Sequence, residues 1–149
     1  MRRWLMKTEP DTFSIDDLAA RKLEPWDGVR NYQARNFIRE MRRGDGVLIY
    51  HSSCAVPGVA GVAKIASAPK ADPSQFDPRG DHFDAGSDPA DPRWSLVDVR
   101  FVRKLKRVIT LDEIKQLDGL GDFALTRRGN RLSVLPVSDA QWQAILERE

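Results

Sequence analysis

Three short helix starts, each placed between apolar runs of strand length, constrain the fold of this chain most. Each start is a capping box, in which a Ser or Thr caps the helix and the side chain three residues later caps back. The three boxes are Ser14–Asp17, Thr110–Glu113 and Ser138–Gln141. The order of strands and short helices has no βαβ rhythm. It therefore predicts an α+β domain with a curved, largely antiparallel sheet or barrel.

The hydrophobic spacing places the individual elements along the chain. Gly58 and Gly61 lie within one expected strand and mark a bulge or a close approach of backbone or ligand. Pro136 implies that its strand is an edge or ends there. The expected helices are 15–23, 32–43, 111–117 and 139–147, and the expected strands are 2–7, 46–51, 58–65, 94–105 and 131–137.

Length and composition describe a globular chain. Its 149 residues are 41% hydrophobic and 31% charged, so we expect one domain over residues 1–149 with a substantial core. The only cysteine, Cys54, excludes an intramolecular disulfide framework. Three apolar residues after Arg2 and Arg3 are too few for a signal peptide, and no run is long enough to span a membrane. We expect a soluble, cytoplasmic protein that makes no membrane contact.

Charge is distributed unevenly. Residues 69–93 contain six Asp against three basic residues, a net charge of −3, so the total of +2 leaves +5 on the rest of the chain. This imbalance indicates an anionic partner, although a basic solvated surface explains it equally well. The same segment holds five of the nine prolines and shows no periodicity, which predicts a long functional or mobile excursion.

Signals for catalysis are weak. The chain has no nucleophile elbow, phosphate-binding loop, dinucleotide fingerprint or zinc-protease motif. His51 and Cys54 form a base–thiol pair in one interpretation and a buried structural pair in the other. His51, His82 and an aspartate of 81–91 could form a metal site, but they match no specific metal motif. The acidic segment lacks the spacing of a calcium-binding loop. We therefore expect no catalytic residue, no metal and no cofactor.

The four tryptophans are more informative. Trp4 and Trp142 are placed as core residues, in an apolar run and as a helix staple. Trp26 stands in a Pro-Trp-Asp-Gly loop, and Trp94 stands where the acidic segment meets a strand. In one interpretation these two indoles form a slot for a flat ring, where stacking contributes about 1–3 kcal/mol per base. Ordinary core packing is the alternative.

Five parts of the sequence resemble the EVE domain, which the thymocyte nuclear protein family also carries. The most specific is the stretch 26–36, Trp-Asp-Gly-Val-Arg-Asn-Tyr-Gln-Ala-Arg-Asn, and the resemblance extends over residues 2–147. Thr8 stands where serine is more usual and keeps the hydroxyl. The other segments are 4–10, 50–54 with 57–61, 92–94 with 97–99, and 131–134 with 136–137.

The resemblance implies a PUA-like fold, a twisted and mostly antiparallel β-barrel with short surrounding helices, related to YTH domains. It also implies a non-catalytic protein that binds nucleic acid, DNA or RNA, and accepts a flipped, modified base. A monomer is expected. The base pocket implied by position consists of Thr8, Glu9, Trp26, Val29, Arg30, Asn31, His51, Ser52 and Trp94, and the implied phosphate contacts are Lys7, Arg93, Arg103 and Lys104.

Several alternatives remain at this point. Asn31 is also a good N-cap for the helix that follows it, and Lys7 and Glu9 are spaced for a local ion pair. An enzyme that processes nucleotides, with His51 and a loop aspartate as acid and base, is the second hypothesis for the function. An adaptor that docks through residues 69–93 is the third.

Overall fold

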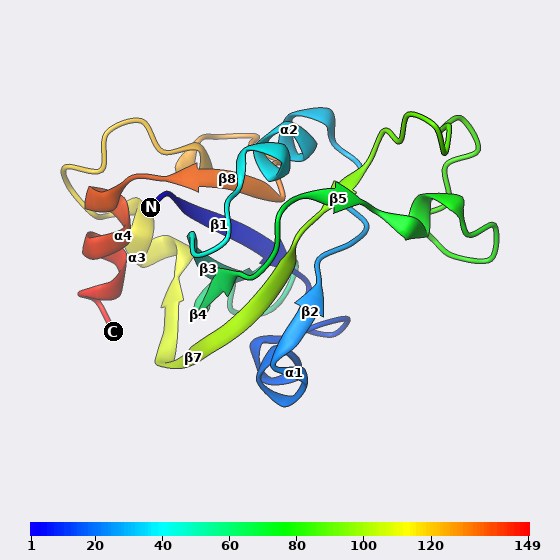
Figure 1. The fold of residues 1–149 in the computed structure, drawn as a ribbon. Coiled ribbons are helices and arrows are strands. Elements are labelled where there is room, and N and C mark those ends of the chain that lie inside the picture. Colours follow the sequence, from blue (N-terminus) through cyan, green and yellow to red (C-terminus); the bar gives the residue numbers. More distant parts are fainter.

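The computed structural model describes residues 1–149 and confirms the expected α+β class. One sheet of six strands, in the order β2-β7-β4-β3-β1-β8, curls into a half-barrel (Figure 1). A separate pair, β5 and β6, leads into the excursion. The strands are β1 Arg3–Thr8, β2 Leu23–Pro25, β3 Gly46–His51, β4 Gly58–Ile65, β5 Lys70–Ala71, β6 Ser95–Leu96, β7 Asp98–Thr110 and β8 Val134–Val137.

Four short α-helices surround the sheet, and their starts are where the sequence predicts them. Ser14, Thr110 and Ser138 each cap a helix through a complete capping box. The second helix was expected over 32–43, but it ends at Glu40, and Met41 is its C-cap. The helices are α1 Ile15–Arg21, α2 Tyr32–Glu40, α3 Leu111–Lys115 and α4 Asp139–Leu146, with 3-10 helices at Pro73–Phe76 and Ala124–Thr126.

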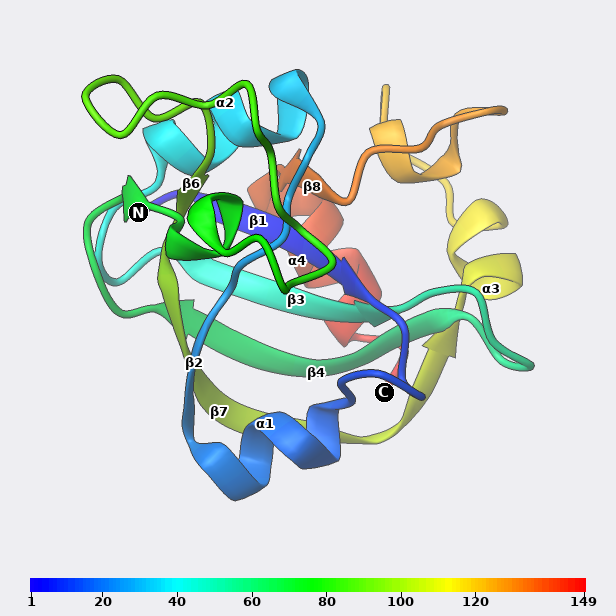
Figure 2. The same cartoon turned by 90° about the vertical axis from the view of Figure 1, so that its right-hand side faces the viewer.

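The strand register brings two chain segments together at one edge of the sheet. All neighbouring strands are antiparallel except β1 and β3, which run parallel so that Thr8 pairs with His51. Parallel neighbours end on the same side, so the residues that follow β1 and β3 start from the same edge. β2, the strand that follows α1, also lies at the front of the molecule in the view of Figure 2.

The core is one cluster of 31 buried residues that includes Val47–Tyr50 of β3. Trp4 is fully buried, as expected, whereas Trp142 is only partly buried against the cluster. The predicted irregularity in β4 is present, with register shifts beside Gly61. Ile15 occupies the space that a side chain at Gly61 would fill, so this glycine allows α1 to lie against the sheet.

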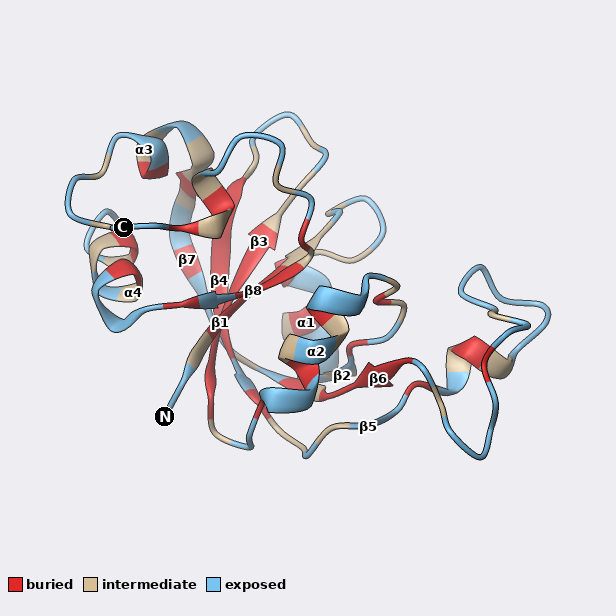
Figure 3. Cartoon of the chain, turned by 90° about the horizontal axis from the view of Figure 1, so that it is seen from above, coloured by how far each residue is buried: buried red, intermediate tan, exposed pale blue.

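The excursion differs from the expectation of an irregular segment. It projects from the half-barrel (Figure 1) but has its own buried centre around Gln75, visible as the red patch in the projecting part of Figure 3. The Gln75 amide donates to Asp72 O and Trp94 O, and its oxygen accepts from Ser87 Oγ and Trp94 N–H. These bonds hold the segment in one conformation without an apolar core.

Three strand predictions need correction. No strand was expected between the helix 15–23 and the loop around Trp26, yet β2, Leu23–Pro25, pairs with β7 there. The expected strand 94–105 is divided at Val97, and its second part extends to Thr110. The strand expected from Arg131 begins only at Val134. No helix of the structure has the length and apolar character that crossing a membrane requires.

Candidate nucleic-acid interface

A recess opens where β1 and β2 end beside the excursion, on the side that faces the viewer in Figure 2. We call it the Trp26 recess. Its volume is about 180 Å³, the room of roughly six water molecules in the liquid. This volume is enough for one nucleobase. The recess is lined by Lys7, Thr8, Thr12, Phe13, Glu24, Pro25, Trp26, Asp27 and His82.

Trp26 forms the aromatic wall. Its side chain packs edge-on against Phe13, with ring centroids 5.9 Å apart, and its backbone N–H donates to Val97 O. The residue is 8% exposed, so it belongs to the edge of the core and still borders the recess. The Phe13 ring holds the indole and the bond to Val97 holds the backbone, so the wall is already formed in the unbound protein.

The excursion closes one side of the recess and is fixed there by a buried carboxylate. Asp72 is fully buried and accepts from Gly28 N–H at 2.9 Å and from the Arg30 guanidinium at 3.1 Å. Arg30 also donates to His82 O and to Ser74 Oγ. The predicted base contact of Arg30 is thus replaced by an anchoring role.

Gly28 makes the close approach of the excursion possible. Its φ is +81°, in the region that favours glycine, and a Cβ there would lie 2.6 Å from the His82 ring nitrogen. A larger residue would therefore displace His82 from the wall of the recess. His82 comes from the acidic segment, so two parts of the chain far apart in sequence build this site.

Lys7 and Thr8 enter the recess from the end of β1. Burial lowers the pKa of the Lys7 ammonium below its usual 10.5, and the nitrogen lies 5.8 Å from the centroid of the Tyr50 ring. Lys7 has no ion pair, so the pair with Glu9 considered from the sequence is absent. The Thr8 hydroxyl donates to Phe13 O at 2.7 Å and holds the 9–13 turn.

Four other predicted pocket residues do not line the recess. Glu9 is exposed, and Val29 is buried in the core. Asn31 caps α2, with its side chain accepting from Ala34 N–H at 2.9 Å, as the alternative from the sequence predicts. Ser52 donates its backbone N–H to Thr8 O and so supports the strand end behind the recess.

His51 also has a structural role. Its Nε2 accepts from Ile15 N–H at 3.1 Å, and burial lowers the pKa of the imidazole. The charged groups that act on it are Asp16 and Lys104, and no aspartate of the 69–93 segment is among them. The acid–base pair that the enzyme hypothesis requires is therefore not assembled.

Trp94 lies elsewhere, which corrects the expected slot between two indoles. Its ring stacks on Tyr32 with centroids 4.8 Å apart, and its indole N–H donates to Asp84 at 2.8 Å. It is 5% exposed and does not line the recess. Packing against α2 and the excursion explains this tryptophan, so one indole forms the wall.

The remaining expected phosphate contacts already have carboxylate partners. Arg93 lies 3.5 Å from Asp84, Arg103 lies 2.8 Å from Glu149, and Lys104 lies 2.9 Å from Asp16. None of these three lines the recess. Of the four predicted phosphate contacts, only Lys7 is at the site, and it lies inside the recess.

Sequence reasoning missed six residues that line the recess. Pro25 and Asp27 flank Trp26, so the loop signal around that tryptophan was sufficient to include them. Phe13 lies next to the Ser14 capping box, which predicts a helix start and says nothing of a pocket, and His82 lies in a segment without periodicity. The missed residues are Thr12, Phe13, Glu24, Pro25, Asp27 and His82.

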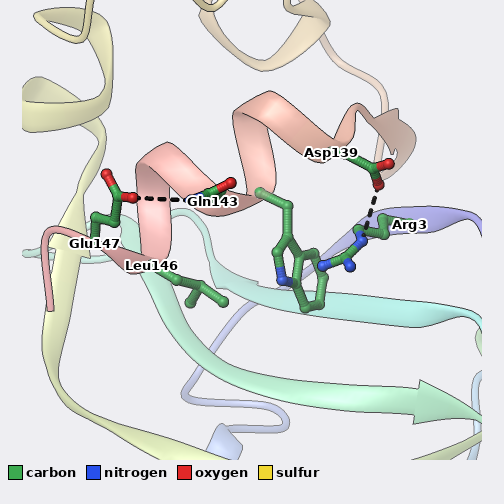
Figure 4. A pocket seen from close by; sticks show the side chains of 6 residues that line it. Arg3, Asp139, Gln143, Leu146 and Glu147 are labelled. Carbon is green, nitrogen blue, oxygen red and sulfur yellow. Dashed lines mark hydrogen bonds and ion pairs between the residues drawn. The ribbon is translucent and has the colours of Figure 1, made fainter.

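A larger hollow lies on the face of α4, near Trp142 (Figure 4). There the Arg3 guanidinium lies 4.6 Å from the Trp142 ring centroid and 3.1 Å from Asp139. The hollow measures about 520 Å³ and is a shallow surface feature with ion-paired walls. No group of three or more His, Cys, Asp or Glu is placed to hold a metal ion.

Comparison with known proteins decides the family. The family model of the EVE domain matches residues 2–148. The chain belongs to the EVE domain family. Thymocyte nuclear protein 1 of Danio rerio is 42% identical, and the match covers 99% of this chain and 71% of that protein. That relative is nuclear by name, so a cytoplasmic location stays a prediction for this chain.

Solved structures give the same result. A protein from Pseudomonas syringae superposes with a TM-score of 0.95 at 47% identity, covering 98% of both chains. Human THYN1, solved in complex with DNA that contains 5-methylcytosine, superposes with a TM-score of 0.94 at 40% identity. That comparison covers 99% of this chain and 97% of the human chain. The EVE resemblance and the fold expected from it are therefore confirmed.

Proposed function

We propose that this chain binds DNA that carries 5-methylcytosine and accepts the modified base, extruded from the duplex, in the Trp26 recess. The observation that carries the proposal is a base-sized recess with an indole wall, in a chain 40% identical to a protein solved with such DNA. The protein acts as a reader and leaves the base unchanged.

The lining of the recess suits a methylated pyrimidine. The Trp26 and Phe13 rings and the Pro25 ring supply apolar surface for a flat ring and its methyl group. Burying one methyl group contributes roughly 0.8 kcal/mol, which is a factor of about four in affinity. The polar side chains between them supply partners for the polar edge of the base.

Extrusion of a base from a duplex costs a few kcal/mol, so the recess must repay that cost. Stacking against an aromatic side chain returns about 1–3 kcal/mol. Because these terms nearly cancel, the methyl contact decides how strongly the duplex is bound. A duplex with unmodified cytosine therefore binds more weakly at the same position.

Fluorescence polarisation on labelled duplexes tests the proposal. Two duplexes of identical sequence, one with cytosine and one with 5-methylcytosine at a single position, are titrated with the protein at fixed salt. We expect at least about fourfold tighter binding to the methylated duplex, from the burial of one methyl group. Equal affinities would refute the reader function.

Matched tryptophan variants localise the effect. Trp26→Leu keeps an apolar side chain but removes the stacking surface, so the preference for the methylated duplex should be lost. Trp142→Leu makes the same change on the face of α4, away from the recess, and should retain the preference. Mass spectrometry of the oligonucleotides after incubation should show no change, and a processed base would instead indicate an enzyme.

RNA oligonucleotides of matched sequence, with and without 5-methylcytosine or N6-methyladenine, extend the test to the other nucleic acid. We propose DNA as the ligand because the human relative was solved with DNA. Tighter binding to a modified RNA than to the methylated duplex would reassign the ligand and keep the reader class.

A further inference from the structure

Two charged side chains of the Trp26 recess have no partner in the folded protein. Lys7 forms no ion pair and donates no side-chain hydrogen bond, and Asp27 lines the recess with a carboxylate that is equally free. The other carboxylate of the recess, Glu24, accepts from Arg21 at 2.8 Å and 3.1 Å. The recess therefore offers one free cationic donor and one free anionic acceptor.

A cytosine ring presents the complementary pair of groups. Its exocyclic N4 amine donates, and the neighbouring N3 and O2 accept. An acidic side chain accepting from N4 is an established way to recognise cytosine. Thymine carries the same 5-methyl group, but it has a carbonyl oxygen at position 4 and a hydrogen on N3. The methyl contact alone therefore cannot separate 5-methylcytosine from thymine.

Building on the proposed function, we propose that Asp27 accepts from the N4 amine of the extruded base while Lys7 donates to its N3 or O2. The recess then selects an aminopyrimidine and rejects thymine. A thymine in the same position turns its O4 carbonyl toward the Asp27 carboxylate, so two acceptors face each other.

Burial of Lys7 supports this assignment. A half-buried ammonium has lost part of its hydration, which disfavours its charged form and accounts for its lowered pKa. An acceptor on the bound base would restore one hydrogen bond to the ammonium. Since Tyr50 is the nearest ring and gives only a 5.8 Å contact, the amine is free to turn toward a ligand.

Competition between two bases that share the methyl group tests the proposal. One duplex carries 5-methylcytosine and the other carries thymine, each opposite an abasic site so that neither has a pairing partner to lose. We expect the wild type to bind the 5-methylcytosine duplex about tenfold or more tightly than the thymine duplex, the usual range for a correct base contact.

Two isosteric variants separate the roles of the carboxylates. Asp27→Asn introduces an amide that donates to thymine O4, so the ratio between the two affinities should fall toward one. Asp11→Asn makes the same change at an exposed aspartate that does not line the recess, and should keep the wild-type ratio. Because both variants remove one negative charge, non-specific attraction to DNA cancels in the comparison.

The outcomes distinguish this proposal from the one on which it rests. If the wild type prefers 5-methylcytosine over cytosine but binds thymine as tightly as 5-methylcytosine, only the proposed selection of an aminopyrimidine is refuted. An Asp27→Asn variant that keeps the wild-type ratio also overturns it, as does an equal loss in Asp11→Asn. A wild type without any preference for the methylated duplex refutes the proposed function itself.

Discussion

Among single residues around the recess, those that hold the backbone in place differ from those that remain free for a ligand. Asp72 is the clearest of the first kind, because four donors converge on its buried carboxylate: Gly28 N–H, the Arg30 guanidinium, and the amide and hydroxyl of Ser74. Lys7 and Asp27 are of the second kind. A residue that fixes the recess should affect folding first, and a free residue should affect binding alone.

Asp72→Asn should lower the free energy of unfolding at pH 7 by about 3 kcal/mol, since it leaves the Arg30 charge without its partner. Burial alone would raise the pKa of Asp72, but the bonds from Ser74, Gly28 and Arg30 lower it below its usual 3.8. The carboxylate therefore stabilises the fold above pH 3.8, and this contribution is lost as pH falls through the lowered pKa.

Urea unfolding at pH 7 and pH 3 measures both effects. Other carboxylates have lowered pKa values, such as Glu113 at about 2, and their protonation in acid also destabilises the fold. The effect of Asp72 is therefore the difference between the variant and the wild type. We expect a smaller loss of stability on acidification for Asp72→Asn than for the wild type. An identical loss in both proteins would contradict the role assigned to Asp72.

Gly28→Ala should weaken binding to the methylated duplex, because the added Cβ displaces the His82 ring from the recess. The change also places alanine at a positive φ, which costs roughly 1 kcal/mol of stability. Gly119→Ala is the matched control, since Gly119 has a φ of +74° and open space around it. Calorimetric titration of both variants should show reduced affinity only for Gly28→Ala, and equal affinities would argue against the contact.

Among the secondary-structure elements, helix α2 shows how a specific sequence motif can mislead about a site. Asn31 belongs to the stretch that carries the EVE resemblance, yet its side chain caps the helix. Asn31→Ala should cost about 1 kcal/mol of stability, and Asn31→Ser should retain most of it. Thermal unfolding measures the cost. A loss of DNA affinity in the folded Asn31→Ser variant would instead indicate that Asn31 contacts the DNA.

The elements whose signals are local were predictable from the sequence. The capping boxes and the strands Gly46–His51 and Gly58–Ile65 depend on neighbours in the chain, and the structure confirms them. Strand β2 was missed because its three residues are exposed or half-buried, and only pairing with β7 makes them a strand. Such pairing is a property of the tertiary fold.

The candidate site was predictable only in part, for the same reason. Trp26 and Trp94 look alike in sequence, as aromatic residues at the edges of loops. What separates them is distant in the chain: Tyr32 stacks on Trp94, whereas Phe13 packs edge-on against Trp26, which borders the recess. The contribution of His82 depends on how the 69–93 segment folds back, which no local pattern encodes.

For the whole molecule, the distribution of free charge is the feature that bears on DNA binding. At the basic end of β7, Arg103 and Lys104 pair with Glu149 and Asp16. Each phosphate contact contributes about 0.9 to the slope of log affinity against log salt. Arg103→Gln and Lys104→Gln should therefore leave that slope unchanged. A decrease of about 0.9 in either variant would assign a phosphate contact to this strand.

The central claim is that the methylated base leaves the duplex and enters the Trp26 recess. A duplex with 2-aminopurine stacked next to 5-methylcytosine reports this directly, because 2-aminopurine is quenched by stacking and brightens when its neighbour is extruded. We predict that emission rises on saturation with the wild type and stays low at equal occupancy by Trp26→Leu. Unchanged emission at saturating wild-type protein would contradict the account.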